Sequence, residues 1–353
     1  MAKKKTQTDN NGYDIMRADL KNNQLRRMYI LYGEERYLLH YYRAELRKKT
    51  VAGIAEEFNY HCFTDENWNV DAMADALDAI PMMSQRSFVE IIDVNLFDKQ
   101  RPDSDRQKLT ELFSNLPDYC TVALVYDAIP WKPDKRMKKL WDAISGAALE
   151  VEFEIQSEHQ LIPWILRHLA PFGKTMSTDL CRYLILQTGG YMATMAAELE
   201  KLCNYSDQPV LTKNDIDAVV IPVLDAEIYH ISDAIRQQDY ELAIQKLRSL
   251  LQQNMEPILI NAAIGRQLRQ LYIAKTLAEH GRSAYDMMKI CGISESNAKW
   301  IFNQATKFKK PVLKEGIMLC ADTDLSLKST TADATELLEM IVFRLAERSR
   351  GVI

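Results

Sequence analysis

The first 155 residues alternate short apolar runs with longer segments whose apolar positions follow the helical period. The runs containing ILY, EII and ALVY are nearly continuous in apolar residues, which is typical of parallel strands buried on both faces. The segments between the runs have the length and spacing of amphipathic helices. Strands are predicted at 28–32, 58–63, 88–93, 121–126 and 149–153, and helices at 34–49, 70–80, 105–115 and 134–144.

This alternation predicts a mainly parallel sheet with helices on both faces, because parallel neighbours need a crossover that packs on the sheet. We therefore expect an α/β domain over residues 13–156. Residues 1–12, MAKKKTQTDNNG, are polar and are expected to form a disordered tail.

Beyond about residue 155 the strand pattern stops and one helical pattern follows another. An apolar stripe of helical spacing follows the Gly-Gly pair in TGGYMATMAAELEKLCNYS, and Pro257 suits the first turn of a long later helix. Pro222 in VVIPVLD interrupts a helical pattern, which places a boundary near residue 220. The sequence thus predicts an all-α part with two blocks, 157–220 and 221–353.

Composition and charge narrow the class of protein. The chain of 353 residues has 44 Lys and Arg against 49 Asp and Glu, so its net charge of −5 does not by itself indicate nucleic-acid binding. The six cysteines are scattered without a C-x-x-C pair. No apolar segment follows Lys3–Lys5, so no signal peptide is predicted, and no apolar run approaches the length of a membrane span. A reduced, cytoplasmic protein with no membrane contact is the simplest interpretation.

The turn after the first predicted strand has the strand–glycine–helix pattern of a phosphate-binding loop but not its chemistry. Gly33 is followed by EERYLL, which lacks both the second glycine and the Lys-Ser or Lys-Thr of such a loop. Two carboxylates at the helix start would also repel a phosphate. Asp127 ends a later strand, yet Ala128 stands where an ATPase needs a glutamate to activate water. We therefore expect no bound nucleotide.

Other cofactor chemistry has little support in the sequence. The histidines form no H-E-x-x-H motif and no close pair with a cysteine, so no metal site is predicted. The TGGY segment follows a helical pattern instead of a strand and is interpreted as a helix break. No G-x-S-x-G motif or acid/base carboxylate pair is found. The predicted cofactor set is empty.

Several stretches in order resemble one family, the delta subunit of the bacterial DNA polymerase III clamp loader. The stretches are YILYGEERYLL, ALDAIPMMSQRSFVEIIDV, DKRMKKLWDAI, GGYMATMAAELEKL and IYHISDAIRQQDYELAIQKLRSLL. Their order and spacing, over nearly the whole chain, carry the resemblance. It implies an AAA+-like domain without a working ATP site, a small helical lid domain at 157–220 and a C-terminal helical collar domain at 221–353.

The resemblance also implies a function and partners. Such a subunit binds the ring-shaped sliding clamp and opens it, or holds it open, for loading onto primed DNA during replication. It is not itself an enzyme, although it belongs to the DNA-directed DNA polymerase III holoenzyme, a nucleotidyltransferase assembly. The implied partners are the clamp (the beta subunit), the delta-prime and gamma/tau subunits through the collar, and primer–template DNA. Apolar residues on more than one side of ILINAAIGRQLRQLYIAKTL fit partner helices in such a collar.

The resemblance places the clamp contact after the helix that is predicted to end near Ile80. The residues are Ile80, Pro81, Met82 and Met83, and flexible methionines suit an adaptable apolar pocket. From the sequence alone, a methionine pair beside a helix is as readily explained as part of the core, so both interpretations stand at this point.

A basic cluster in WKPDKRMKKLWDAI is the candidate DNA contact. Lys132, Lys135, Arg136 and Lys139 have helical i, i+3 and i+4 spacing, so several of them are expected to share one face. That face would either contact phosphates of the primer–template or be an ordinary solvated surface.

Two other functions remain open from the sequence. One is an active ATP-binding AAA+ protein, such as a motor subunit of the loader or a helicase loader, which a nucleotide titration would reveal. The other is a helical adaptor without a role in replication, which would have no affinity for the clamp.

Overall fold

The structure is a computed structural model that describes residues 11–51, 53, 56–293, 295–329 and 332–349. Of the predicted tail, residues 1–10 lie outside the described residues. The prediction is wrong for Asn11 and Gly12, which begin helix α1 (Asn11–Asn22). The helix packs on strand β5, where a Cβ atom at Gly12 would lie 1.9 Å from the carbonyl oxygen of Glu150. The segment is the first turn of a helix that buries Met16 and Leu20, which explains why it does not remain a tail.

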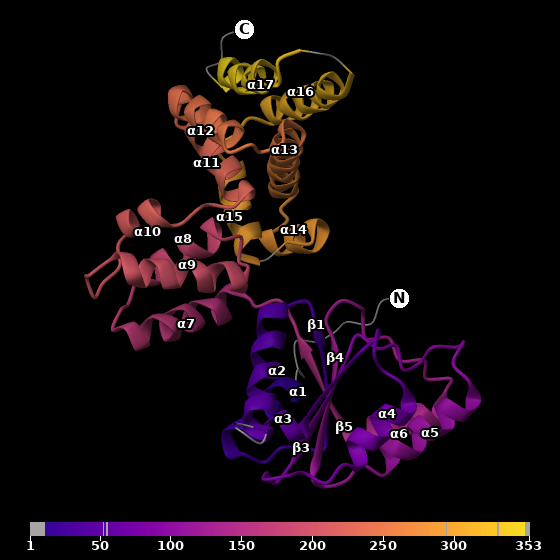
Figure 1. The fold of residues 1–353 in the computed structure, drawn as a ribbon. Helices are drawn as coiled ribbons and strands as arrows, with labels where there is room; N and C mark the ends of the chain where they lie inside the picture. Colours follow the sequence, from indigo (N-terminus) through magenta and orange to yellow (C-terminus); the bar gives the residue numbers. More distant parts are fainter. Residues whose placement is uncertain (1–10, 52, 54–55, 294, 330–331, 350–353) are drawn as a thin grey trace. The chain divides into compact units, whose positions relative to one another are not determined.

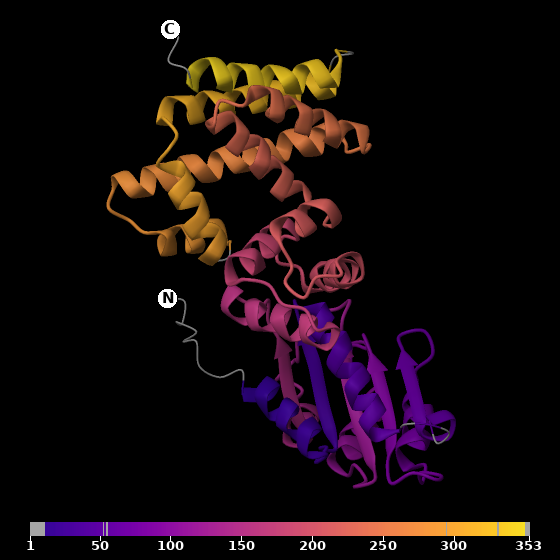
Figure 2. The same ribbon diagram turned by 90° about the vertical axis from the view of Figure 1, so that its left-hand side faces the viewer.

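The α/β unit contains one five-stranded parallel sheet with the strand order β2-β3-β4-β1-β5. Figure 2 shows the strand arrows pointing the same way. The predicted parallel sheet is therefore confirmed. Its strands are β1 (Met28–Gly33), β2 (Tyr60–Thr64), β3 (Ser87–Ile92), β4 (Cys120–Tyr126) and β5 (Ala148–Phe153).

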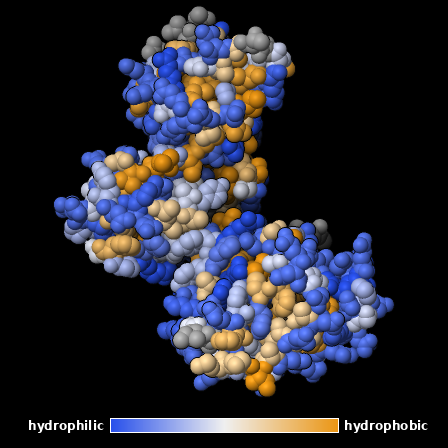
Figure 3. Space-filling model, viewed as in Figure 1, coloured by the Kyte–Doolittle hydropathy of each residue, from blue (hydrophilic) through white to orange (hydrophobic). Residues whose placement is uncertain are grey.

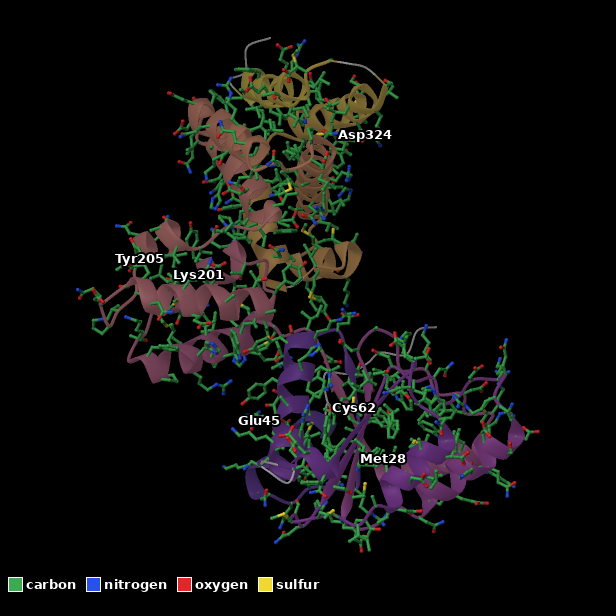
Figure 4. All side chains as sticks on the ribbon, in the orientation of Figure 1. Met28, Glu45, Cys62, Lys201, Tyr205 and Asp324 are labelled. Carbon is green, nitrogen blue, oxygen red and sulfur yellow. The ribbon has the colours of Figure 1, made fainter. Side chains whose placement is uncertain are left out.

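Helices cover both faces of the sheet (Figure 1). Met28, labelled in Figure 4, belongs to the apolar core under α4, α5 and α6, whereas Glu45 lies on α2, which covers the other face. Alternate residues of β1 point to opposite faces, and both sets are buried, as a doubly covered sheet requires. The helices are α2 (Arg36–Thr50), α3 (Glu56–Asn59), α4 (Val70–Asp78), α5 (Asp103–Ser114) and α6 (Lys138–Ala147).

Two predicted element boundaries are wrong for local reasons. The strand predicted from residue 58 begins at Tyr60, because Asn59 still belongs to the short helix α3. The helix predicted from residue 134 begins only at Lys138. The Asp134 side chain accepts a hydrogen bond from the backbone N–H of Arg136, which stabilises a turn before the helix.

The second compact unit begins at Gln156 and is helical. Its first helices surround the Gly-Gly segment, where Gly189 and Gly190 have φ values of 69° and 78° and separate α8 from α9. The predicted helix break is thus confirmed. The elements are α7 (Glu158–Leu169), the 3₁₀ turn η2 (Ala170–Phe172), α8 (Thr178–Gln187), α9 (Met192–Tyr205) and α10 (Lys213–Val219).

The remaining helices pack around the long helix α13 (Pro257–Glu279), which has Pro257 at its start as predicted. Helices α14 and α15 are separate because Gly292 adopts a left-handed conformation that ends the first. The others are α11 (Leu224–Arg236), α12 (Tyr240–Gln252), α14 (Ala284–Cys291), α15 (Glu295–Ala305), α16 (Lys310–Ser329) and α17 (Ala334–Ser349).

The apolar residues on more than one side of α13 are buried within this chain. Helices α11, α14, α15, α16 and α17 all contact α13, and Gly316 of α16 lies so close that a Cβ atom there would meet Leu268 at 2.9 Å. Apolar residues on more than one side of α13 are therefore explained by its central position in the unit. They do not by themselves require a partner subunit. In the described part of the chain, every helix is too short or too polar to span a bilayer.

Candidate functional site

The connection from α4 to β3 exposes a group of apolar side chains, which we call the tip and define as residues 80–83. Ile80, Met82 and Met83 are 78%, 58% and 84% exposed, and Pro81 is half-buried. The alternative that the methionine pair belongs to the core is therefore wrong. Figure 3 shows hydrophobic atoms reaching the surface at the lower edge of the α/β unit.

The backbone of the tip is held in one conformation by a neighbouring segment. The carboxamide of Asn59 donates a hydrogen bond to the Met82 carbonyl oxygen and accepts one from the Met82 N–H, both at 2.7 Å. The next residue, Met83, has φ of 57°, in the left-handed region. That conformation costs a non-glycine residue on the order of 1–3 kcal/mol and persists only where the surroundings impose it. The tip is thus exposed but ordered.

At the opposite edge of the sheet, Gly33 ends β1 where a nucleotide-binding fold would begin its phosphate loop. Gly33 has φ of 138°, and a Cβ atom there would lie 2.3 Å from the carbonyl oxygen of Phe153 on β5. Glycine is therefore required here by the close approach of two strand ends, which explains its presence without any phosphate.

A side chain of the protein caps the amino terminus of helix α2. Glu35 caps the helix, and its carboxylate accepts a hydrogen bond from the backbone N–H of Tyr37 at 3.2 Å. The Glu35 residue is only 8% exposed, and burial raises the pKa of its carboxyl group above the usual value. A carboxylate therefore lies where a helix amino terminus would otherwise attract a phosphate.

The two aspartates at the carboxyl ends of β3 and β4 are also engaged by groups of this chain. The Arg36 guanidinium donates to the Asp127 carbonyl oxygen at 3.1 Å, and His40 Nε2 lies 3.1 Å from Asp127 Oδ2. Asp93 Oδ1 accepts hydrogen bonds from the backbone N–H groups of Asp127, Ala128 and Ile129 at 2.9, 2.9 and 3.1 Å. We call Gly33, Glu35, Arg36, Asp93 and Asp127 the filled loop.

The four predicted DNA-contacting residues are exposed, but they do not share a helical face. Lys132, Lys135 and Arg136 precede α6, and only Lys139 lies on it. Arg136 forms an ion pair with Asp134 at 2.6 Å, and Lys135 Nζ lies 4.9 Å from the centre of the Trp141 ring. The turn at Asp134 thus replaces the predicted face with a short basic segment followed by a helix.

Sequence reasoning missed a buried polar network between α2 and the sheet. Arg43 donates to both carboxylate oxygens of Glu90, at 2.6 and 2.9 Å, and the Tyr60 hydroxyl donates to the same carboxylate at 2.7 Å. Glu90 is fully buried in β3. The signal was present in the sequence, because a glutamate within the apolar run FVEII requires a cationic partner once it is buried.

Within the described ranges, no three metal-ligating side chains gather into a group. All six cysteines are free thiols there. Burial raises the pKa of Cys120 and of Cys181 to about 11 in each case, which disfavours the reactive thiolate at these two positions.

Comparisons of the sequence with family models and with known proteins point to the same family. Residues 29–154 match the family model described as DNA polymerase III, delta subunit, and residues 225–345 match the model for the C-terminal domain of that subunit. The DNA polymerase III subunit delta of Bacillus subtilis is 25% identical over 343 residues, which cover 96% of this chain and 97% of that protein. The probable DNA polymerase III subunit delta of Aquifex aeolicus is 25% identical over 329 residues, covering 91% and 92% of the two chains.

A solved structure, the Bacillus subtilis DNA clamp loader delta protein, has the same fold with a TM-score of 0.63 at 24% identity. The likeness covers 95% of this chain and 99% of that chain. The expected fold class, an AAA+-like parallel sheet domain followed by an all-α part, is thereby confirmed.

The parallel sheet followed by the helical part has the fold of a clamp-loader protein. More narrowly, the chain belongs to the DNA polymerase III delta subunit family and is a clamp-loader subunit of DNA replication.

Proposed function

We propose that this subunit binds the sliding clamp through the tip and opens the ring, or holds it open, while it is loaded onto primed DNA. The observation that carries the proposal is the tip itself: Ile80, Met82 and Met83 are exposed together on an ordered backbone. Burying two methionine side chains in a partner pocket contributes roughly 3–6 kcal/mol before ordering costs. This is enough to anchor an interface around which further contacts form.

Opening a ring requires no chemistry from this subunit. It requires tighter binding to the opened, less curved clamp than to the closed one, because only the difference in affinity shifts the equilibrium. An exposed apolar wedge on a rigid sheet edge suits that task.

The subunit acts without nucleotide in this proposal. The support is the filled loop, in which Glu35 caps the start of α2 while Arg36 and Asp93 contact the main chain after β4. An ATP titration of the isolated subunit, followed by fluorescence of a labelled nucleotide, is expected to give no saturable signal. Saturable binding would favour the rival function of an active ATPase.

The assembly partners follow the family. We propose contacts with delta-prime and gamma/tau subunits through the helical collar at 221–353, with the lid domain at 157–220, and a cytoplasmic location. The exposed Lys132, Lys135 and Lys139, with Arg136, remain the candidate contacts to primer–template DNA. If these lysines touch phosphates, replacing all three by alanine reduces the salt dependence of DNA binding by the assembled loader.

The clamp contact is tested by measuring the affinity of the subunit for purified clamp. The double variant Met82→Ala/Met83→Ala is expected to weaken binding by 100-fold or more, since about 3 kcal/mol of apolar burial is lost. The matched control is Met318→Ala/Met340→Ala, which removes two methionines of similar exposure, 59% and 51%, from the helical unit. The control is expected to bind like the wild type.

Unchanged clamp affinity in the tip variant would remove these residues from the site. Absence of clamp binding by the wild type would favour the rival function of a helical adaptor outside replication.

A further inference from the structure

We propose that Asn59 is the positioning residue of the tip, which presets the backbone in the conformation that the clamp recognises. This inference rests on the proposed function. Asn59 touches no partner itself in this proposal, because its side chain is buried and only 1% of the residue is exposed. It acts through Met82.

The geometry assigns the role to a carboxamide in particular. Asn59 offers one donor and one acceptor on a single planar group, and both bond the main chain of Met82 at 2.7 Å. The pairing resembles the exchange of two hydrogen bonds between neighbouring strands. No other side chain of this size supplies a donor and an acceptor side by side.

The conformation held by Asn59 is one that the tip would not keep alone. Met83 is in the left-handed region with φ of 57°, and the side chains of Ile80, Met82 and Met83 bury little surface against the rest of the chain. Neither backbone preference nor packing therefore favours this arrangement. The two hydrogen bonds to the adjacent Met82 oppose relaxation of this arrangement.

Asn59 is itself fixed from both sides along the chain. Glu56, three residues earlier, pairs with Arg47 of α2, and Arg47 also lies 3.7 Å above the ring of Tyr60, the next residue. Tyr60 is anchored in turn to the buried carboxylate of Glu90. The positions on either side of Asn59 are thus tied to the helix and the sheet, so the carboxamide is a rigid point for the tip.

A second, weaker support lies where α4 ends. The Tyr119 hydroxyl donates to the carbonyl oxygen of Asp78 at 3.1 Å, just before the tip. The tip is therefore held at its start by Tyr119 and at Met82 by Asn59. Such pre-ordering increases affinity, because a partner that selects one conformation binds in proportion to the fraction of molecules that already have it.

The test uses the full-length chain and purified clamp, with Asn59→Ala as the main variant. We expect the dissociation constant to rise roughly tenfold through a slower association rate, with the dissociation rate changed less than threefold. Amide hydrogen exchange at residues 82–84 is expected to accelerate while exchange in β3 and β4 stays as in the wild type. A residue that merely stabilised the domain would not confine its effect to the tip.

The matched control is Asn261→Ala. Asn261 is likewise a buried asparagine whose side chain donates to a main-chain carbonyl, that of Cys320, but it lies in the helical unit. Its replacement is expected to leave clamp association unchanged. Tyr119→Phe, which removes the second support, is expected to slow association two- to threefold and keeps the test informative if Asn59→Ala fails to fold.

The outcomes separate the two proposals. If Met82→Ala/Met83→Ala abolishes binding but Asn59→Ala and Tyr119→Phe bind at the wild-type rate, the positioning role is overturned and the clamp contact stands. If the methionine variant also binds like the wild type, the clamp contact itself is overturned.

Discussion

The tip and the filled loop lie at opposite edges of one sheet and differ in how their side chains are used. The loop has polar contacts within the chain, whereas the tip exposes apolar side chains to solvent. The loop follows the carboxyl ends of β1, β3 and β4, whereas the tip precedes the amino end of β3, about 20 Å away along a six-residue strand. In the loop, Arg36 donates to the main chain at Asp127, and Asp93 accepts three main-chain hydrogen bonds. At the tip, apolar groups are kept in water. One edge is occupied by polar contacts within the chain, and the other exposes apolar side chains.

The two edges differ in whether their side chains make contacts within the chain or remain exposed to solvent. In the filled loop, Arg36 and Asp93 already form hydrogen bonds within the chain. The tip leaves its apolar area unburied, so association with a partner gains the free energy that folding did not.

The largest expected effect is a loss of stability on breaking the ion pair between α2 and β3, the strand that runs from the tip to the filled loop. Arg43→Ala removes the cation from α2 and leaves Glu90 buried without its charged partner, which costs about 3–5 kcal/mol. Urea unfolding measures the loss. Arg136→Ala, which breaks only the exposed pair with Asp134, is expected to change the free energy of unfolding by less than about 0.5 kcal/mol. Similar losses in both variants would contradict the importance of the buried network.

The next largest effect is expected from replacing Gly33, which tests whether the close approach of β1 and β5 requires glycine at this position. Gly33→Ala places a Cβ atom against the main chain of Phe153 at positive φ, and we expect a loss of about 2–4 kcal/mol in thermal or urea unfolding. Gly146→Ala is the opposite case, because nothing lies within 4 Å of its Cβ position in α6. It is expected to stabilise the protein by about 0.5–1 kcal/mol. A neutral Gly33→Ala would mean that the strand ends can separate at little cost.

The smallest effect concerns the carboxylate that fills the start of α2. Burial raises the pKa of Glu35 in the folded state above its usual value of 4.5, so the folded protein binds this proton more tightly than the unfolded chain does. The charged form then opposes folding above the raised pKa, and the penalty disappears as the pH falls through the window from that pKa to 4.5. Glu35→Gln keeps an acceptor for the Tyr37 N–H without the charge.

We therefore expect Glu35→Gln to be slightly more stable than the wild type at pH 7 and to lose this advantage below about pH 4.5. Paired urea titrations at both pH values measure the difference. A wild type that is more stable than the variant at pH 7 would show that the cap needs the full negative charge.

The sequence predicted most of the fold because its periodicities are strong. Each strand of the sheet overlaps a predicted apolar run, and Gly33, Pro257 and the Gly-Gly pair lie where the backbone needs them. The boundaries at Asn59 and Asp134 were missed because side-chain hydrogen bonds set them. An asparagine that ends a short helix to bond Met82, 23 positions away, leaves no periodic signal.

By itself, the sequence determined the parallel sheet, the helical second part and the lack of a phosphate loop, since these follow from local patterns and from residue types that are present or missing. Only the tertiary structure decided that the methionine pair is exposed, that Asn59 holds it and that Glu35, Asp93 and Arg36 fill the old loop. Exposure and pairing depend on which distant segments meet. These contacts cannot be read from local patterns, because they join side chains that are far apart in the sequence and come together only in the folded chain.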